Sequence, residues 1–213
     1  MSKISNLDNN IDRGLFLPLM EDFYTIQGEG YFTGSSAYFL RIGGCDVGCH
    51  WCDVKESWNA DIHPATDVND IVRRVVENSN KSIVVVTGGA PLMWDMNFLT
   101  ESLNSHSIKV HLETSGSYSL TGKWDWICLS PKKNQEPLES IQDVANELKI
   151  IVHNKTDFRW AEKQRGLVNQ DCKLYLQPEW SKREKMTPII VDYILNNPEW
   201  NISLQTHKYL DLP

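Results

Sequence analysis

The chain has 213 residues, of which 41% are hydrophobic, and a formal net charge of −7. This length and composition are typical of a globular domain with a sizeable core. The negative charge argues against broad binding to nucleic acid or acidic membranes, and no apolar run approaches the roughly 20 residues of a membrane span. Residues 1–18 lack the apolar core of a signal peptide, so we expect a polar leader, a single domain over 19–213 and a cytoplasmic location.

The hydrophobic pattern alternates between β-rich runs and helical stretches along the chain. We expect a strand at 37–42 and a helix at 66–78, with Thr66 or Asp67 as its N-cap. The β-branched run at 82–89 is typical of a buried parallel strand. A helix is expected at 95–104. The later strands are expected at 108–116, 124–132, 147–154, 172–178 and 201–208, and the later helices at 156–165 and 187–196.

Strand–helix alternation predicts an α/β fold with a parallel sheet. A complete eightfold barrel typically needs about 250 residues, so we expect an incomplete (β/α) barrel of about six to seven parallel strands. Most of the expected strands end in glycine or polar residues, as in RIGGC, VVTGGAP and LQTHK. Because the carboxyl ends of parallel strands meet at one edge, we expect an active site there.

Three of the five cysteines lie close together after the first expected strand, as Cys45-x3-Cys49-x2-Cys52. In a reducing compartment, clustered cysteines bind metal more often than they form disulfides. Three thiolates can bind three irons of a cubane and leave the fourth iron open. A structural zinc ion would need a fourth ligand, which His50 could supply only from an awkward place between two cysteines. The other two cysteines stand alone in strand-like runs, which favours positions in the core.

The cysteine spacing, with Trp51 directly before the third cysteine, resembles that of radical S-adenosylmethionine enzymes. The resemblance implies a [4Fe-4S] cluster on Cys45, Cys49 and Cys52, with S-adenosylmethionine bound to the fourth iron. Reductive cleavage then gives a 5′-deoxyadenosyl radical. The segment TGGAP at 87–91 is similar to the GGEP motif that binds the methionyl amino group. Ala90 replaces the usual Glu, but that contact is made largely by backbone carbonyls.

Longer segments resemble the 7-carboxy-7-deazaguanine synthase family over about residues 19–213. They are FYTIQGEGYFTGSSAYFLRIGGC, LETSG, LSPK, LQP and LQTHKYLDLP. The resemblance implies conversion of 6-carboxy-5,6,7,8-tetrahydropterin to 7-carboxy-7-deazaguanine plus ammonia, by hydrogen abstraction at C6 and ring contraction, for queuosine or another 7-deazapurine. It also implies a barrel of the radical SAM type, a homodimer, and an electron donor such as flavodoxin or ferredoxin. We expect no nucleic-acid or membrane partner.

The family resemblance assigns roles to individual residues of this chain. The implied substrate-binding residues are Ile26, Gln27, Gly28, Arg41, Thr87, Gln205, His207 and Pro213. The implied cofactor-binding residues are Trp51, Cys52, Asp53, Gly89, Ser130, Pro131 and Lys132. Glu29 and Glu113 are catalytic candidates that hydrogen-bond the pterin or move protons, and a structural role is the alternative. The guanidinium of Arg41 suits a carboxylate, and Pro213 is expected to act through the chain terminus unless that terminus frays.

A magnesium site is the least certain implication of the resemblance. Family members usually carry a threonine two residues after the third cysteine, and its hydroxyl binds Mg²⁺. This chain has Val54 there, which offers no side-chain oxygen. Since Mg²⁺ tolerates several water ligands, water, Asp53, Glu56 or Ser57 could replace the hydroxyl, or Lys55 could supply the positive charge. We expect Mg²⁺ dependence to be weakened but retained.

Two other functions stay open at this point. A radical activase of a glycyl radical partner fits the small size and the cysteine spacing, and it would require a partner protein. An iron–sulfur electron carrier is the second alternative, although carriers use four cysteines rather than three. Binding of S-adenosylmethionine to the cluster would separate a radical enzyme from a carrier.

Overall fold

A nine-stranded mixed sheet forms the centre of the computed structural model, which describes residues 13–213. Its order is β3-β1-β2-β4-β5-β6-β7-β8-β9. The strands are β1 (Phe16–Ile26), β2 (Ser36–Ile42), β3 (Ala65–Asp67), β4 (Ile83–Gly88), β5 (Val110–Thr114), β6 (Trp126–Leu129), β7 (Glu147–Val152), β8 (Lys173–Pro178) and β9 (Trp200–Ile202). β2 and β4 to β9 run parallel, whereas β1 is antiparallel to both β2 and β3.

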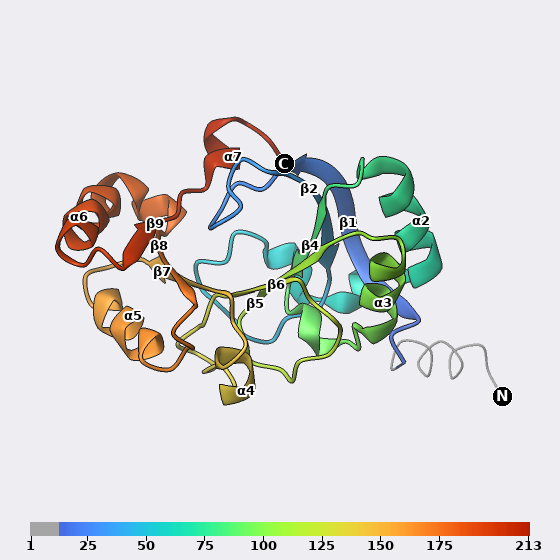
Figure 1. Ribbon diagram of the computed structural model, residues 1–213, viewed down its shortest axis with the longest axis horizontal. Coiled ribbons are helices and arrows are strands. Elements are labelled where there is room, and N and C mark those ends of the chain that lie inside the picture. Colours follow the sequence, from blue (N-terminus) through green and yellow to red (C-terminus); the bar gives the residue numbers. More distant parts are fainter. Residues whose placement is uncertain (1–12) are drawn as a thin grey trace.

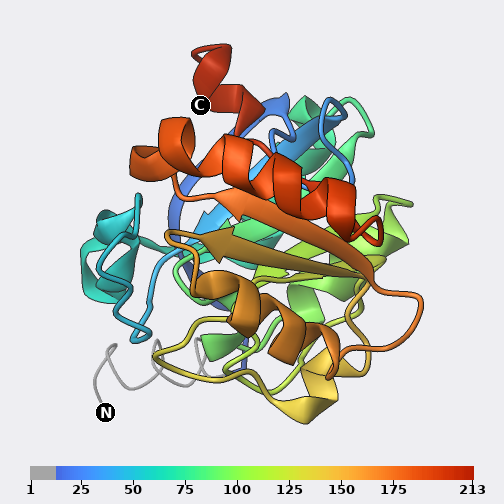
Figure 2. The same ribbon diagram turned by 90° about the vertical axis from the view of Figure 1, so that its left-hand side faces the viewer.

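The sheet curves around a central space without closing, and the helices lie outside the curve (Figure 1). The helices are α2 (Val68–Asn78), α3 (Asn97–Ser105), α4 (Glu139–Gln142), α5 (Asp157–Arg165), α6 (Arg183–Asn196) and α7 (Thr206–Tyr209). Short 3-10 turns are η1 (Lys55–Trp58), η2 (Ala60–Ile62), η3 (Pro91–Met93) and η4 (Trp180–Lys182). Figure 2 shows α5 and α6 covering the strands β7 to β9. The expected incomplete barrel with seven parallel strands is therefore confirmed.

The antiparallel strands β1 and β3 were not among the expected elements. β1 begins with an apolar run at 16–20, but Pro18 interrupts it. A proline within such a run argues against a strand inside a sheet, so the sequence alone did not identify β1. The predicted leader, residues 1–18, lies outside the described residues as far as residue 12, and β1 already begins at Phe16. No helix within residues 13–213 is long and apolar enough to cross a membrane.

Two expectations near the C-terminus were wrong in their bounds. The segment expected as a strand at 201–208 leaves the sheet after Ser203, whose N–H donates to the Leu176 carbonyl at 2.9 Å. It then forms α7, because its backbone turns to pair with another loop instead of extending the sheet. α6 begins four residues earlier than expected, at Arg183, and includes Pro188.

Local sequence explains the best-predicted helix, α2. Asp67 is its N-cap, and its side-chain oxygen accepts a hydrogen bond from the Asn69 N–H at 2.8 Å. One face of the helix carries the buried apolar side chains Val68, Ile71, Val72 and Val75. An amphipathic face of this kind packs on the sheet, which stabilises the helix more than propensity alone.

The core runs along both faces of the parallel strands. In β4 the three consecutive residues Val84, Val85 and Val86 are fully buried, as expected for a strand covered on both sides. The isolated cysteines Cys128 and Cys172 are also buried, so the expectation that they belong to the core is confirmed.

Two loops bridge the open side of the curved sheet. The Thr206 N–H donates to the Gly28 carbonyl at 2.9 Å, and the Gly30 N–H donates to the Ser203 hydroxyl at 2.9 Å. These bonds join the loop after β1 to the segment after β9. Residues that are about 175 positions apart in the sequence therefore form one wall of the central space.

Candidate active site

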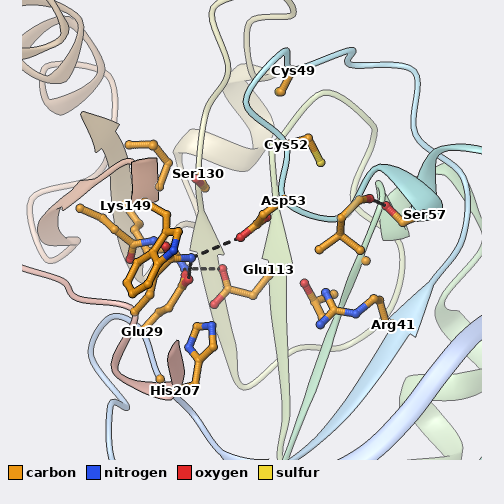
Figure 3. A pocket seen from close by; sticks show the side chains of 18 of the residues that line it. Glu29, Arg41, Cys49, Cys52, Asp53, Ser57, Glu113, Ser130, Lys149 and His207 are labelled. Atoms are coloured by element: carbon orange, nitrogen blue, oxygen red, sulfur yellow. Dashed lines mark hydrogen bonds and ion pairs between the residues drawn. The ribbon is translucent and has the colours of Figure 1, made fainter. Parts of the chain in front are cut away.

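A cavity of about 570 Å³ lies within the curve of the sheet and opens at the carboxyl ends of the parallel strands. Its wall includes Arg41 from β2, Thr87 from β4, Glu113 from β5 and Lys149 from β7 (Figure 3). In Figure 2 the cysteine-containing loop after β2 lies at the end of the sheet toward which the strand arrows point. The polar endings of the expected strands therefore meet at one site.

Nearly all the candidate residues of the sequence analysis line this one cavity. They are Ile26, Gln27, Gly28, Glu29, Arg41, Cys45, Cys49, Trp51, Cys52, Asp53, Thr87, Gly89, Glu113, Ser130, Lys132, Gln205, His207 and Pro213. Pro131 is the exception. It is buried between Ser130 and Lys132 and does not belong to the cavity wall.

The cysteine loop is shaped by its own backbone and by two glycines. Gly44 and Gly48 adopt positive φ angles of 103° and 66°, which only glycine adopts readily. The Cys52 N–H donates to the Cys49 carbonyl at 3.0 Å. All three cysteines are free thiols that reach the cavity, and burial raises the pKa of both Cys45 and Cys49.

The arrangement of these thiols distinguishes the metal chemistries considered for them. Among residues 13–213, no three His, Cys, Asp or Glu side chains converge as ligands of one metal ion. A structural zinc site needs four ligands around a single ion. Three cysteines that each bind a different iron of a cubane need not converge in this way. Free cysteines on a cavity wall therefore fit a cluster with an open iron.

The glycine segment after β4 packs directly on the cysteine loop. A side chain at Gly89 would place its Cβ 2.2 Å from the Gly44 carbonyl oxygen and 2.9 Å from Cys45 Cβ. The Ala90 N–H donates to the same Gly44 carbonyl at 2.7 Å. Ala90, which stands where the motif usually has Glu, is 4% exposed. Glycine is therefore required here by the close approach of two backbones.

A buried ion-pair network crosses the cavity floor. The Nζ atom of Lys149 lies 2.7 Å from Glu29 Oε2 and 2.9 Å from Glu113 Oε2. The Gln205 amide donates to the other oxygen of Glu29 at 2.9 Å. Figure 3 shows these side chains meeting from the loop after β1, from β5 and from β7.

The network controls the charge of its members. Burial alone would raise the pKa of Glu29, but Lys149 and Gln205 lower it to about 2. Burial would lower the pKa of Lys149, and the surrounding acidic groups raise it well above its ordinary value. The carboxylate of Glu29 and the ammonium of Lys149 are consequently both charged at neutral pH.

The C-terminal segment closes the cavity near the cysteine loop. Lys208 Nζ lies 2.6 Å from Asp53 Oδ2, and the same ammonium lies 5.1 Å from the centre of the Trp180 ring. His207 packs so closely on Gly28 that a Cβ there would lie 2.1 Å from its Nδ1 atom. Burial lowers the pKa of His207, which favours its neutral form. The last residue, Pro213, reaches the cavity wall.

Two further cations line the cavity. Arg41 donates from Nε to Glu21 at 2.6 Å, and its guanidinium lies 5.8 Å from the centre of the Phe23 ring. Lys132 donates to the Ser130 carbonyl at 2.5 Å and to its hydroxyl at 2.7 Å. Burial lowers the pKa of Lys132. The cavity wall thus offers cations that can bind anionic groups.

Sequence reasoning missed Lys149 and Lys208 as site residues. Lys149 stands in the otherwise apolar run KIIV, at an inward position on the same face of β7 as Glu147 and Ile151. A charged residue at an inward position of a buried strand needs a partner, and that signal could have identified it. Lys208 gave no comparable signal, because its partner Asp53 is 155 residues away.

Comparisons with known proteins found matches to this chain in sequence and in fold. The family model of the radical SAM superfamily matches residues 40–129. The 7-carboxy-7-deazaguanine synthase of Flavobacterium psychrophilum is 60% identical over 95% of this chain and 96% of its own length. That of Synechocystis is 47% identical over 91% and 92%. The crystal structure of QueE from Escherichia coli superposes with a TM-score of 0.80 at 27% identity, over 92% of this chain and 97% of the other.

Proposed function

Because the chain belongs to the 7-carboxy-7-deazaguanine synthase family of radical SAM enzymes, we propose that it is a lyase of 7-deazapurine biosynthesis. It converts 6-carboxy-5,6,7,8-tetrahydropterin to 7-carboxy-7-deazaguanine and ammonia. One observation supports this reading most directly. A single cavity brings together three free cysteines, the glycine segment packed on their loop, and paired carboxylates bridged by a buried lysine.

Cys45, Cys49 and Cys52 would hold the [4Fe-4S] cluster, and the backbone at Gly89 with Ser130 and Lys132 would hold S-adenosylmethionine beside it. When bound and reduced, this pair supplies a 5′-deoxyadenosyl radical. The protein's part is placement, since a misplaced reacting atom costs far more than a weakened contact. The backbone contact between Gly89 and Gly44 fixes the distance between the two loops.

The substrate would lie between Arg41 and the carboxylate pair. A guanidinium matches a carboxylate with two parallel hydrogen bonds, so Arg41 is suited to the 6-carboxylate. Ionised Glu29 and Glu113 accept hydrogen bonds from N–H groups of the pyrimidine edge, and Ile26, Gln27, Gly28, Thr87, Gln205 and His207 complete the wall. Pro213, which also lines the cavity, is a further candidate for contact with the substrate. The aromatic rings of Phe23 and Phe39, stacked 5.4 Å apart, exclude water from one side.

The reaction has a direct test. Enzyme with a reconstituted cluster is incubated without oxygen with the carboxytetrahydropterin, S-adenosylmethionine and a reductant, and the products are identified by mass. We expect 7-carboxy-7-deazaguanine and one ammonia per turnover. Cleavage of S-adenosylmethionine without any deazaguanine would refute the proposed function.

We also propose that turnover retains a weak dependence on Mg²⁺. Val54 offers no side-chain oxygen, but Asp53 lies on the same stretch of the cavity wall, and the Ser57 hydroxyl donates to the Val54 carbonyl at 2.7 Å. Asp53 is already paired with Lys208, which lowers its value as a ligand. Removal of Mg²⁺ by a chelator should lower activity partly, and Val54→Thr should steepen the Mg²⁺ response. Equal activity with and without the metal would contradict this proposal.

Three further assignments belong with this function. We propose a flavodoxin or ferredoxin as the electron donor, a homodimer as the assembly, and a reducing compartment such as the cytoplasm, because the three cysteines must stay free to bind iron. Turnover with each reduced protein and light scattering of the purified enzyme test the first two assignments.

A further inference from the structure

Lys149 occupies a central place in the cavity although the proposed reaction gives it no part. Its side chain is 4% exposed, whereas those of its partners Glu29 and Glu113 are 19% and 20% exposed. The ammonium is thus enclosed and the carboxylates face the cavity. Figure 3 shows the side chains of Glu29, Glu113 and Lys149 meeting at this point of the cavity.

The charges around Lys149 come from several elements. Glu147 lies two residues earlier on β7, Cys128 on β6 and Glu113 on β5. Glu29 comes from the loop after β1, His207 from α7, and the ammonium of Lys132 from the segment after β6. Lys149 is the cation that contacts both cavity-facing carboxylates. Without it, two carboxylates would share a poorly solvated site, and one of them would take up a proton.

Protonation would change what the site can bind. An ionised carboxylate only accepts hydrogen bonds, whereas a carboxylic acid also presents an O–H donor. The amino-pyrimidinone edge of a pterin presents N–H donors. A donor facing a donor leaves both unpaired, and an unpaired buried polar group is costly.

We propose that Lys149 is a positioning residue of the pterin site, which holds Glu29 and Glu113 side by side and ionised so that both accept hydrogen bonds from the N–H groups of the substrate. This inference rests on the proposed function and deepens it. The lysine acts through its two partners, and its hydrogen bonds within residues 13–213 go to Glu29 and Glu113 rather than to the cysteine loop. Its low exposure and its two short contacts carry the assignment, and the pKa of about 2 at Glu29 agrees with it.

The first experiment compares Lys149→Met, Lys149→Arg and a matched control in the cluster-loaded enzyme. The control is Lys123→Met, since Lys123 is 73% exposed and pairs with Glu101 at 3.2 Å away from the cavity. We expect Lys149→Met to raise KM for the pterin by on the order of tenfold or more, and to move the acidic limb of kcat/KM to higher pH. Lys149→Arg should restore most of both properties, and Lys123→Met should match the native enzyme.

A second readout separates positioning from general damage. The change that S-adenosylmethionine produces in the electron paramagnetic resonance spectrum of the reduced cluster should survive in Lys149→Met, because the lysine does not contact the cysteine loop. A native KM and an unshifted pH profile in Lys149→Met would overturn the inference. Failure of the native enzyme to make deazaguanine would instead overturn the proposed function.

A charge-balanced variant covers the possibility that Lys149→Met does not fold. Lys149→Met combined with Glu29→Gln leaves one carboxylate and no buried cation, so it avoids two unpaired negative charges. If the lysine acts through its two partners, its removal should raise KM by less in the Glu29→Gln background than in the native enzyme, because only Glu113 is then left to position. Additive effects on KM would show that Lys149 acts independently of Glu29 and would also overturn the inference.

Discussion

Glu147 makes the stability of the protein depend on pH, and the magnitude of this dependence can be worked out from the structure. Its side chain is 3% exposed. Oε2 accepts hydrogen bonds from the Tyr31 N–H at 3.2 Å and from the Trp126 indole N–H at 3.1 Å, whereas Oε1 has no partner among the described residues. Burial raises the pKa of Glu147 to about 6, against an ordinary value of 4.5.

The sign of the effect follows from proton binding. Between about pH 4.5 and pH 6 the folded protein holds a proton on Glu147 that the unfolded chain has released, so stability falls as pH rises through this window. The raised pKa amounts to about 2 kcal/mol of destabilisation above the window. About 1 kcal/mol of that should appear between pH 5 and pH 7, since part of the change is complete below pH 5.

Glu147→Gln removes the titrating group and keeps the shape of the side chain. Urea unfolding of the native enzyme and the variant at pH 5, 6 and 7 measures the difference in their free energies of unfolding. We expect that difference to shift by about 1 kcal/mol in favour of the variant from pH 5 to pH 7. Glu184→Gln is the control, because the side chain of Glu184 is 90% exposed. A difference that does not change with pH would refute the reasoning.

Two further substitutions test the glycine segment after β4 and the N-cap of α2. Gly89→Ala should lower both iron content after reconstitution and binding of S-adenosylmethionine, because its Cβ would overlap the Gly44 carbonyl; a fully loaded and active variant would contradict the close approach of the two loops. Asp67→Ala should cost about 1 kcal/mol through loss of the α2 N-cap, seen as a fall of about 3 °C in Tm, and an unchanged Tm would show that the cap contributes little.

The parallel part of the fold was predictable because a buried parallel strand has a continuous apolar run in its sequence. Val84 to Val86 on β4 illustrate this, since all three are buried on both faces of the sheet. The apolar run at the start of β1 is interrupted by Pro18, and the antiparallel pairing of β1 with β2 depends on contacts that no local pattern records. The turn from β9 into α7 was missed for a related reason. It is fixed by a backbone hydrogen bond between Thr206 and Gly28, which lie 178 residues apart.

Some residues of the site could likewise be predicted from the sequence, and others could not. Cys45, Cys49 and Cys52 could be found from spacing, because one short loop must carry all three ligands. Lys149 could not be assigned to the site from spacing, because its partners Glu29 and Glu113 come from two other elements 120 and 36 residues away. The available signal was a charged residue in an otherwise apolar strand, because a buried ammonium needs a partner of opposite charge or a hydrogen-bond acceptor.

The fate of the hydrogen on C6 of the pterin tests the central claim most directly. The enzyme is incubated without oxygen with substrate that carries deuterium at C6, with S-adenosylmethionine and with a reductant, and the recovered S-adenosylmethionine is analysed by mass. If the cavity places C6 against a 5′-deoxyadenosyl radical that is then returned to the cofactor, deuterium accumulates in S-adenosylmethionine while deazaguanine forms. Formation of deazaguanine with no deuterium in S-adenosylmethionine or in 5′-deoxyadenosine would contradict the account.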